Sequence, residues 1–330
     1  TGPDVEKCLG QFHSVEYEQW VEVTDGVRAR FWNAGHLLGS ASIEIEITVP
    51  GAKPARQTFL FSGDLGPDFK LLHPDPDAPN GFDHVICEAT YGARERSDRT
   101  PARRRMRLAS EVSDAAKRGG ALVIPSFAVE RTQELVTDLV TLMEEGAIPR
   151  ARIFIDSPLA LKASEVFLRH ADELETGAEL ERAFRSKVLH LSQSVEDSKA
   201  INRLKGFFIV IAASGMCDAG RIRHHLKNRL WQRNATVLMV GYQAEGTMGR
   251  LLLEGAKRAR IQGDDITVNA QIRVMNDYSG HADGTELESW IEERQPIRKN
   301  LFLVHSELPA SNGLKDRVGD RLIAHNRIII

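Results

Sequence analysis

The chain has 330 residues, of which 42% are hydrophobic and 27% charged, a balance typical of an ordinary globular protein with room for two domains. Its formal net charge is −3, so there is no overall polycationic signature, and any affinity for nucleic acid must be local. Apolar runs such as residues 207–213 are too short to span a bilayer. Three widely spaced cysteines (Cys8, Cys87 and Cys217) exclude a disulfide framework and a CxxC zinc ribbon, and they favour a reduced, cytoplasmic setting.

The N-terminal part of the chain is predicted to form short β-strands. Residues 43–49 alternate isoleucine or valine with glutamate or threonine, which is the period-2 pattern of a half-buried strand. Shorter apolar runs at 27–31, 58–61 and 84–87 predict further strands. Segment 73–80 is rich in proline and aspartate and is predicted to be a loop.

From about residue 100 the pattern changes to alternating helices and strands. Helices are predicted over 101–118 and 130–145. Short apolar strands are predicted at 121–125, 152–155, 207–212 and 236–240. Each strand is followed by small residues and then a helical pattern, which indicates a parallel, doubly wound sheet. After Ile266 the β character returns, with strands predicted at 272–275 and 301–304. The order β, α/β, β indicates one domain inserted into another.

Four polar clusters follow predicted strands: residues 35–40 (GHLLGS), 62–66 (SGDLG), 279–283 (SGHAD) and 304–307 (VHSE). Each places a histidine or an aspartate next to small residues, and glycine lets the backbone turn sharply there. Imidazole and carboxylate are the usual zinc ligands in sites that keep one position open. Two such metals beside a phosphate can generate hydroxide and neutralise charge. One such cluster is more often a turn than a ligand, but four in this order predict a metal site.

These motifs resemble those of the metallo-β-lactamase superfamily and, within it, the β-CASP nucleases. AGHLLGSA (34–41) and SGDLG resemble the third and fourth metal motifs, and EATYG (88–92), SGHAD and LVHSE (303–307) resemble motifs A, B and C. Ala89 stands where Ser or Thr is usual, and Ser306 where many members have Gly. PSFAVERTQEL (125–135), DSPLA (156–160) and ASGMCDAGRIRHHL (213–226) are similar to landmarks of the inserted β-CASP domain.

The resemblance implies an α/β fold in two parts. We expect an N-terminally incomplete metallo-β-lactamase αββα sandwich built from residues 1–93 and 270–330. A doubly wound α/β β-CASP domain, residues 94–269, is expected to be inserted between these segments.

The resemblance also implies roles for individual residues. His36 is expected to ligate one Zn²⁺, Asp64 to bridge two, and His305 to ligate the second. Glu88 and His281 are expected to form a catalytic pair beside the metals, together with Asp64. In that pair the carboxylate holds the imidazole, and protonated His281 gives its proton to the leaving oxygen.

One family motif is absent from the sequence. No two of the 11 histidines stand as HxH, so the HxHxDH motif, which supplies most ligands of the first zinc, does not occur. The opening residues 1–17 resemble the stretch that follows this motif in complete members, so we expect an upstream segment to be missing. The chain as given then holds at most three direct metal ligands, and we expect it to bind two zincs weakly and to be inactive alone.

Three further features bear on substrate binding. The loop with Ser214 and Gly215, between a predicted strand and helix, is expected to present backbone N–H groups to an anion. Two basic groups are candidates for holding a phosphate backbone, and a solvated helix face is the alternative for the first. The first comprises Arg94, Arg96, Arg99, Arg103, Arg104, Arg105 and Arg107, and the second Arg221, Arg223, His224, His225, Lys227 and Arg229.

Four other polar residues are not assigned to catalysis. His224 and His225 are adjacent on a predicted helix and diverge by roughly 100°, so both cannot bind one metal, and one of them packs or contacts substrate. Asp156 and Asp283 are expected to be loop or helix-cap residues.

The predicted function is a zinc-dependent ribonuclease that hydrolyses RNA phosphodiesters by a two-metal mechanism, in RNA processing or decay. Two alternatives stay open. A DNA-processing β-CASP nuclease usually has an aliphatic residue where this chain has His305, and a non-catalytic RNA-binding or scaffold subunit typically loses several site residues. A small-molecule hydrolase is disfavoured because such relatives lack the inserted domain. RNA is the expected partner, no membrane association is expected, and homodimer formation is left open.

Overall fold

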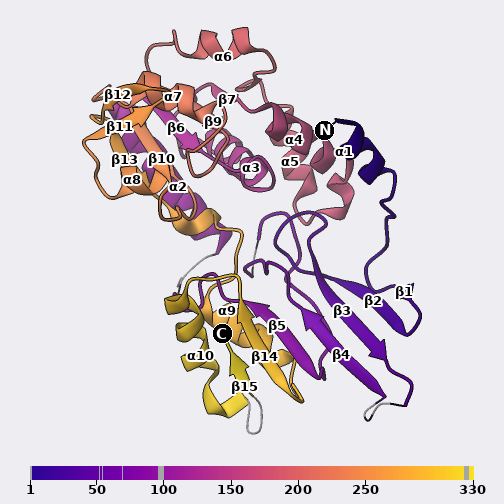
Figure 1. Ribbon diagram of the computed structural model, residues 1–330. Helices are drawn as coiled ribbons and strands as arrows, with labels where there is room; N and C mark the ends of the chain where they lie inside the picture. Colours follow the sequence, from indigo (N-terminus) through magenta and orange to yellow (C-terminus); the bar gives the residue numbers. More distant parts are fainter. Residues whose placement is uncertain (1, 52, 54, 69, 96–99, 323–326) are drawn as a thin grey trace. The chain divides into compact units, whose positions relative to one another are not determined.

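The contacts within a computed structural model divide the chain into two compact units (Figure 1). The first unit comprises residues 1–68, 75–95 and 281–330, and the second comprises residues 69–74 and 96–280. The structure describes residues 2–51, 53, 55–68, 70–95, 100–322 and 327–330. Within these ranges, no helix has both the length and the apolar character needed to cross a membrane.

The first unit contains a seven-stranded mixed sheet with the order β1-β2-β3-β4-β5-β14-β15. Its strands are β1 (Val21–Thr24), β2 (Val27–Asn33), β3 (Ala41–Thr48), β4 (Arg56–Phe61), β5 (His84–Glu88), β14 (Asn300–Val304) and β15 (Arg327–Ile329). β1 to β4 pair antiparallel, whereas the pairs from β4 to β15 are parallel. In the β5–β14 pair, Glu88 lies opposite Val304, so the sheet register aligns two of the predicted motifs.

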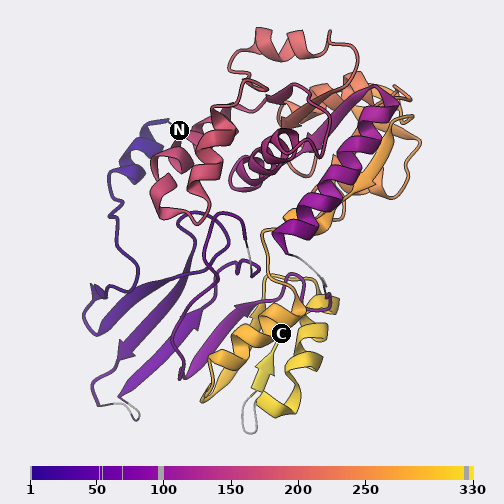
Figure 2. The same ribbon diagram turned by 180° about the vertical axis from the view of Figure 1, so that it is seen from behind.

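Three helices complete the first unit: α1 (Gly2–Leu9), α9 (Gly284–Glu293) and α10 (Leu308–Leu322). α9 and α10 lie against the β5, β14 and β15 end of the sheet in both views (Figure 1, Figure 2). They bury Trp290 and Leu314 against the sheet residues Val85 and Leu301. The apolar alternation of β5 and β14 therefore forms the core of this unit, and it fixes the strand ends that carry the polar motifs.

Strand β3 has the predicted alternation, but its polar side is the more deeply buried one. Glu44 and Glu46 are 5% and 7% exposed, whereas the isoleucines of this strand are only half-buried. Arg30 Nε donates to Glu44 at 2.9 Å and Arg28 Nε donates to Glu46 at 3.1 Å across the β2–β3 pair. Both guanidinium groups also lie over the ring of Trp20. These cross-strand pairs cover the carboxylates, because paired charges can be buried where single ones cannot.

The second unit contains a six-stranded sheet with the order β13-β10-β6-β9-β7-β8, and all of its pairs are parallel. Its strands are β6 (Ala121–Pro125), β7 (Ile153–Ile155), β8 (Leu189–Leu191), β9 (Phe208–Ala212), β10 (Thr236–Met239) and β13 (Gln271–Val274). A separate antiparallel pair is formed by β11 (Arg258–Ile261) and β12 (Asp264–Thr267). The helices are α2 (Pro101–Arg118), α3 (Arg131–Glu144), α4 (Pro158–Arg169), α5 (Gly177–Phe184), α6 (Val195–Ile201), α7 (Ile222–Arg229) and α8 (Met248–Leu253), with 3₁₀ turns at Ala171–Glu173 and Asn276–Tyr278.

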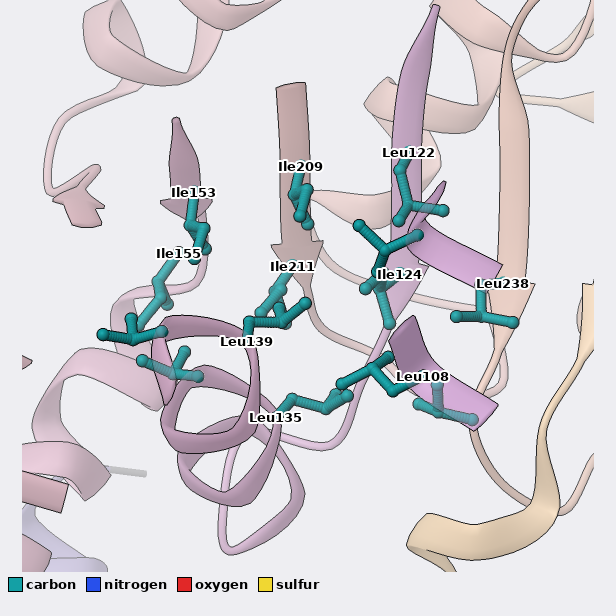
Figure 3. Close-up of a cluster of buried hydrophobic side chains, with 14 of the residues drawn as sticks. Leu108, Leu122, Ile124, Leu135, Leu139, Ile153, Ile155, Ile209, Ile211 and Leu238 are labelled. Carbon is teal, nitrogen blue, oxygen red and sulfur yellow. The ribbon is translucent and has the colours of Figure 1, made fainter. Parts of the chain in front are cut away.

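Helices cover both faces of this sheet. Leu108 of α2 and Leu135 and Leu139 of α3 pack on one face, with Ile124 and Ile209 of the sheet beneath them (Figure 3). On the other face, α6, α7 and α8 pack against the alternate residues of the same strands. The prediction of a doubly wound parallel sheet is therefore confirmed.

The structure differs from the expected boundaries of the inserted domain. The sequence assigns residues 270–280 to the metallo-β-lactamase part, but β13 pairs in parallel with β10 from Thr236 to Met239. Tyr278 is buried in the core of the second unit. Segment 69–74 also belongs to this unit. Contacts with distant segments decide these boundaries, and local sequence patterns do not record such contacts.

A buried polar network joins α2 and α3 to the turn at residues 276–278. Asp138 is fully buried and accepts hydrogen bonds from Arg104 Nε at 2.8 Å and Arg105 Nε at 2.7 Å. The hydroxyl of Tyr278 donates to the same carboxylate at 2.7 Å. Burial raises the pKa of Tyr278 well above its ordinary value, and the Asp138 charge adds to this, so the phenol remains a neutral donor.

Tyr278→Phe is expected to lower the free energy of unfolding by about 1.5–3 kcal/mol, because a buried hydrogen bond to a charged acceptor is lost. Urea unfolding followed by circular dichroism measures this loss. Tyr17→Phe is the matched control, since the hydroxyl of Tyr17 donates to the carbonyl of Ser40 at an exposed position, and a loss of only about 0.5 kcal/mol is expected there. Equal losses in the two variants would contradict the role given to the buried network.

Candidate metal centre

Four loops of the first unit bring His36, Asp64, His281 and His305 together. His36 Nε2 lies 3.9 Å from Asp64 Oδ2, and His305 Nδ1 lies 3.3 Å from Asp64 Oδ1. One ligand atom of His281 is within 4.8 Å of those of His36 and Asp64. His281 belongs to a second such group with Glu88 and His305. Residues separated by up to 269 positions in sequence thus share one small volume at the carboxyl ends of β4, β5 and β14.

Close backbone contact sets the distance between the first two loops. The N–H of Gly66 donates to the carbonyl of Ala34 at 2.8 Å. A Cβ at residue 66 would lie 1.9 Å from the carbonyl oxygen of Gly35, a distance that no side chain permits. Glycine at residue 66 therefore lets the two loops touch, and it places His36 and Asp64 on facing turns.

Glu88 binds three of the loops to one another. Its side chain is almost completely buried. Oε1 accepts the N–H of Leu65 at 2.7 Å and lies 3.0 Å from His281 Nδ1, and Oε2 accepts the N–H of Thr90 at 3.2 Å. Burial opposes the charged form, but these hydrogen bonds outweigh it, so the pKa of Glu88 lies below its ordinary value. An ionised Glu88 can only accept a hydrogen bond, so the contact places a proton on Nδ1 of His281 and orients the imidazole.

His305 is held in an uncommon backbone conformation at the end of β14. Its φ is +57°, which a residue with a side chain rarely adopts. The hydroxyl of Thr90 donates to the carbonyl of His305 at 3.2 Å and lies 3.3 Å from His305 Nδ1. Such backbone strain costs on the order of 1–3 kcal/mol and concentrates at functional sites.

The donor set fits zinc. Two ligands on one tetrahedral zinc, each about 2.0–2.2 Å from the metal, lie roughly 3.3–3.6 Å apart. The 3.3 Å distance between Asp64 and His305 falls in this range, and the 3.9 Å distance between Asp64 and His36 lies just above it. The structure places His281 in the same volume, whereas the sequence assigns it to proton transfer outside the metal shell. That division of roles stays a prediction.

Ser214 and Gly215 lie in the second unit, in the loop after β9. Ser214 Oγ accepts the N–H of Ala219 at 3.3 Å, and the N–H of Ser214 donates to the carbonyl of Ala219 at 3.1 Å. A Cβ at residue 215 would lie 2.7 Å from the ring of Phe127, so a side chain there would force this ring to move. The role of this loop in substrate binding stays a prediction.

Most described members of the two predicted basic groups bind groups of their own unit. Arg104 and Arg105 share Asp138, and Arg107 pairs with Asp277 at 2.6 Å. In the second group, Arg221, Lys227 and Arg229 pair respectively with Asp156, Asp264 and backbone carbonyls. Arg96 and Arg99 lie outside the described residues. Arg104 is buried and Arg105 half-buried, so these two do not belong to a solvated helix face, whereas Arg107 is exposed. A role of this group in phosphate binding stays a prediction.

Asp156 lies in the loop between β7 and α4, as one of the two expectations stated, but its buried contacts were not predicted. It does not cap α4, since Ser157 does. Instead it is fully buried and accepts hydrogen bonds from Ser198 Oγ and Arg221 Nη1, and it lies 2.6 Å from His225 Nε2. His225 is the histidine that packs, as one of the two was expected to, and Asp283 caps α9 as predicted.

The fold and this site define a metal-dependent hydrolase of the metallo-β-lactamase class with an inserted domain. Residues 132–252 match the Beta-Casp domain, and residues 265–325 match the Zn-dependent metallo-hydrolase RNA specificity domain.

Similar proteins agree with these matches. Ribonuclease TTHA0252 of Thermus thermophilus is 34% identical, and the match covers 93% of this chain and 69% of that protein. An RNase J-like protein of Methanocaldococcus jannaschii is 29% identical, and the match covers 92% of this chain and 69% of that protein. The transcription termination factor FttA of Methanosarcina mazei is 27% identical, and the chain spans about half of its length. The chain belongs to the β-CASP ribonuclease family of the metallo-β-lactamase superfamily.

Gly66→Ala is expected to lower the free energy of unfolding by about 1–3 kcal/mol and to reduce bound zinc, because the added Cβ forces the His36 and Asp64 loops apart. Urea unfolding and metal analysis measure both effects. Gly10→Ala is the control, since a Cβ there meets its nearest atoms at an ordinary 3.6 Å. Unchanged stability and zinc content in Gly66→Ala would show that the loops do not need this contact.

Glu88→Gln is expected to destabilise the protein by about 1–3 kcal/mol at pH 7, since an amide NH₂ cannot accept from the backbone donors that the carboxylate satisfies. Because the folded pKa of Glu88 is lowered, its charge stabilises the fold above the ordinary value of 4.5. That stabilisation is lost as the pH falls through the folded pKa. The difference between the two proteins in urea unfolding should therefore shrink below pH 4.5, and a difference independent of pH would contradict the ionised state of Glu88.

Proposed function

We propose that the protein is a zinc-dependent ribonuclease that hydrolyses phosphodiester bonds of RNA with two metal ions, in RNA processing or decay. The observation that carries the proposal is the convergence of His36, His281 and His305 on Asp64, with Glu88 bonded to His281. Membership of the family and the names of the ribonuclease relatives support RNA as the substrate class. The proposed setting is the cytoplasm, and homodimer formation stays open.

In this proposal His36, Asp64 and His305 hold the metal ions. Zinc, when bound, supplies Lewis acidity toward the phosphate and the attacking water. Glu88 keeps Nδ1 of His281 engaged, so proton transfer falls to Nε2. His281 then protonates the leaving oxygen of the cleaved phosphodiester, a step in which a general acid typically contributes about 10²–10⁴-fold. The Ser214–Gly215 loop is proposed to bind the phosphate backbone.

Two other functions are weaker fits to the site. A scaffold subunit has no need for the hydrogen bond between Glu88 and His281 or for the spacing of the ligand atoms around Asp64. A DNA-processing relative usually has an aliphatic residue at the position of His305, which here lies 3.3 Å from Asp64. Comparing cleavage of RNA and DNA of the same sequence by the full-length protein distinguishes these functions.

His281→Ala in the full-length protein is expected to slow RNA cleavage by about 10²–10⁴-fold while the zinc content stays unchanged, since His281 is assigned to proton transfer. His305→Ala is expected to lower both zinc content and rate, because it removes a direct ligand. Metal analysis and a cleavage assay on labelled single-stranded RNA separate the two variants.

His170→Ala is the matched control, because His170 is an exposed histidine whose Nδ1 lies 2.8 Å from Glu173, near it in sequence. It should leave both readouts unchanged. Loss of zinc in His281→Ala with zinc retained in His305→Ala would reverse the two roles. If neither variant slowed cleavage, the assignment of this site would be wrong.

A further inference from the structure

A pocket of about 690 Å³ opens in the second unit at the amino-terminal edge of its sheet. Its walls are the segments that lead into three neighbouring strands: residues 120–121 at β6, 202–206 before β9 and 229–234 before β10. The Ser214–Gly215 loop follows β9, so it lies at the opposite edge, about 16 Å away along the strand. The pocket is therefore distinct from the predicted substrate loop.

All of the charged residues that line this pocket are cationic. Arg203, Lys205 and Arg233 line it with exposed side chains, and no lining residue is an aspartate or a glutamate. In the part of the chain that the structure describes, none of these three cations forms an ion pair, unlike Arg104, Arg105, Arg107 and Arg221 of the same unit. With a net charge of −3 for the whole chain, this is a concentrated local excess of positive charge.

Arg229 lines the pocket and joins two of its walls by hydrogen bonds. It is only 6% exposed, and its Nη2 donates to the carbonyls of Ile201 and Asn202 at 3.0 Å and of Leu204 at 3.3 Å. Its partners are neutral oxygens, so no carboxylate cancels the guanidinium charge. The charge adds to the potential inside the pocket, because low dielectric surroundings screen it poorly.

The remaining lining groups are of the kinds that can bind nucleobases. Trp231 is 56% exposed and presents an indole at the pocket wall. Asn202 Oδ1 is buried without a hydrogen-bond partner among the described residues. Gln232 and Asn234 add further amide groups. Single-stranded nucleic acids are bound by cationic grooves that contain aromatic stacking groups, and amides can pair with base edges.

We propose that this pocket binds a single-stranded segment of RNA, with a base stacked on Trp231 and phosphates contacted by Arg203, Lys205 and Arg233. The proposal rests on the proposed function for the identity of the polyanion. It adds RNA contacts to those expected at the metal centre and at Ser214–Gly215, and it places them on residues with no part in catalysis.

The test measures binding of a fluorescein-labelled 30-nucleotide single-stranded RNA by anisotropy, with the cleavage-deficient His281→Ala holoenzyme as the background. Trp231→Ala should raise Kd about 5- to 150-fold, the effect of losing one stacked base, and Trp231→Phe should restore most of the affinity. The double variant R203Q/K205Q should weaken binding and reduce the slope of log K against log salt by about 1.4, since each phosphate contact contributes about 0.7.

R185Q/K187Q is the matched control, because Arg185 and Lys187 have the same spacing and are exposed elsewhere in the same unit. It should leave both the affinity and the salt slope close to those of the background. Equal slopes for the two double variants, or unchanged affinity in Trp231→Ala, would overturn the proposal. UMP is the second probe: if Trp231→Ala lost binding of UMP but bound the RNA as tightly as the background, the pocket would be a mononucleotide site and the proposal would be overturned.

Failure of the proposed function gives a different result. A zinc-loaded wild-type protein that binds this RNA through the pocket and cuts none of it contradicts the ribonuclease assignment while supporting the pocket. A protein that cuts the RNA with kcat and KM unaffected by R203Q/K205Q and Trp231→Ala supports the assignment and contradicts the pocket.

Discussion

The arrangement of the candidate metal centre depends on one buried anion, the carboxylate of Glu88. Two backbone N–H groups from separate turns and one imidazole nitrogen converge on it, and their residues span 217 positions of the chain. Burial alone would neutralise the group, yet the three contacts keep it ionised. The loops that carry Asp64, Glu88 and His281 therefore cannot move independently. The imidazole is oriented by the protein before any ligand arrives, which is the condition for efficient proton transfer.

Close backbone contacts also hold these loops in position. A Cβ at Gly92 would lie 2.5 Å from the carbonyl oxygen of Ala310, so the Glu88 loop packs directly on α10, just as Gly66 packs on Gly35. Ala89, which departs from the usual Ser or Thr of its motif, is fully buried in the same core. A small apolar side chain fits into that buried position. Glycine stands at these positions because two backbone segments lie too close together for a side chain. This close packing also fixes the positions of the polar residues beside the glycines.

Local signals made much of the secondary structure predictable. α2 covers the predicted residues because Thr100 caps its first turn, Pro101 starts it, and Gly119 ends it in the left-handed conformation. The parallel sheet followed from its apolar strands and intervening helices. The resemblance also named the residues that the first unit brings together around Asp64. Features that depend on partners distant in sequence were not predictable: the burial of Glu44 and Glu46 by arginines of β2, the pairing of β13 with β10, and the contacts of Asp156.

Contacts between residues distant in sequence also decide which basic residues can bind a polyanion. The chain has 46 acidic and 43 basic residues, so an arginine-rich segment finds carboxylates within its own unit, as Arg104 and Arg105 do with Asp138. A cation already held by a buried carboxylate is a poor ligand for phosphate, because binding would leave that carboxylate unpaired. The density of arginines along the sequence therefore overestimates the surface that can bind nucleic acid. The cations that can contact a polyanion are those whose fold gives them only neutral neighbours, and this depends on tertiary structure and not on composition.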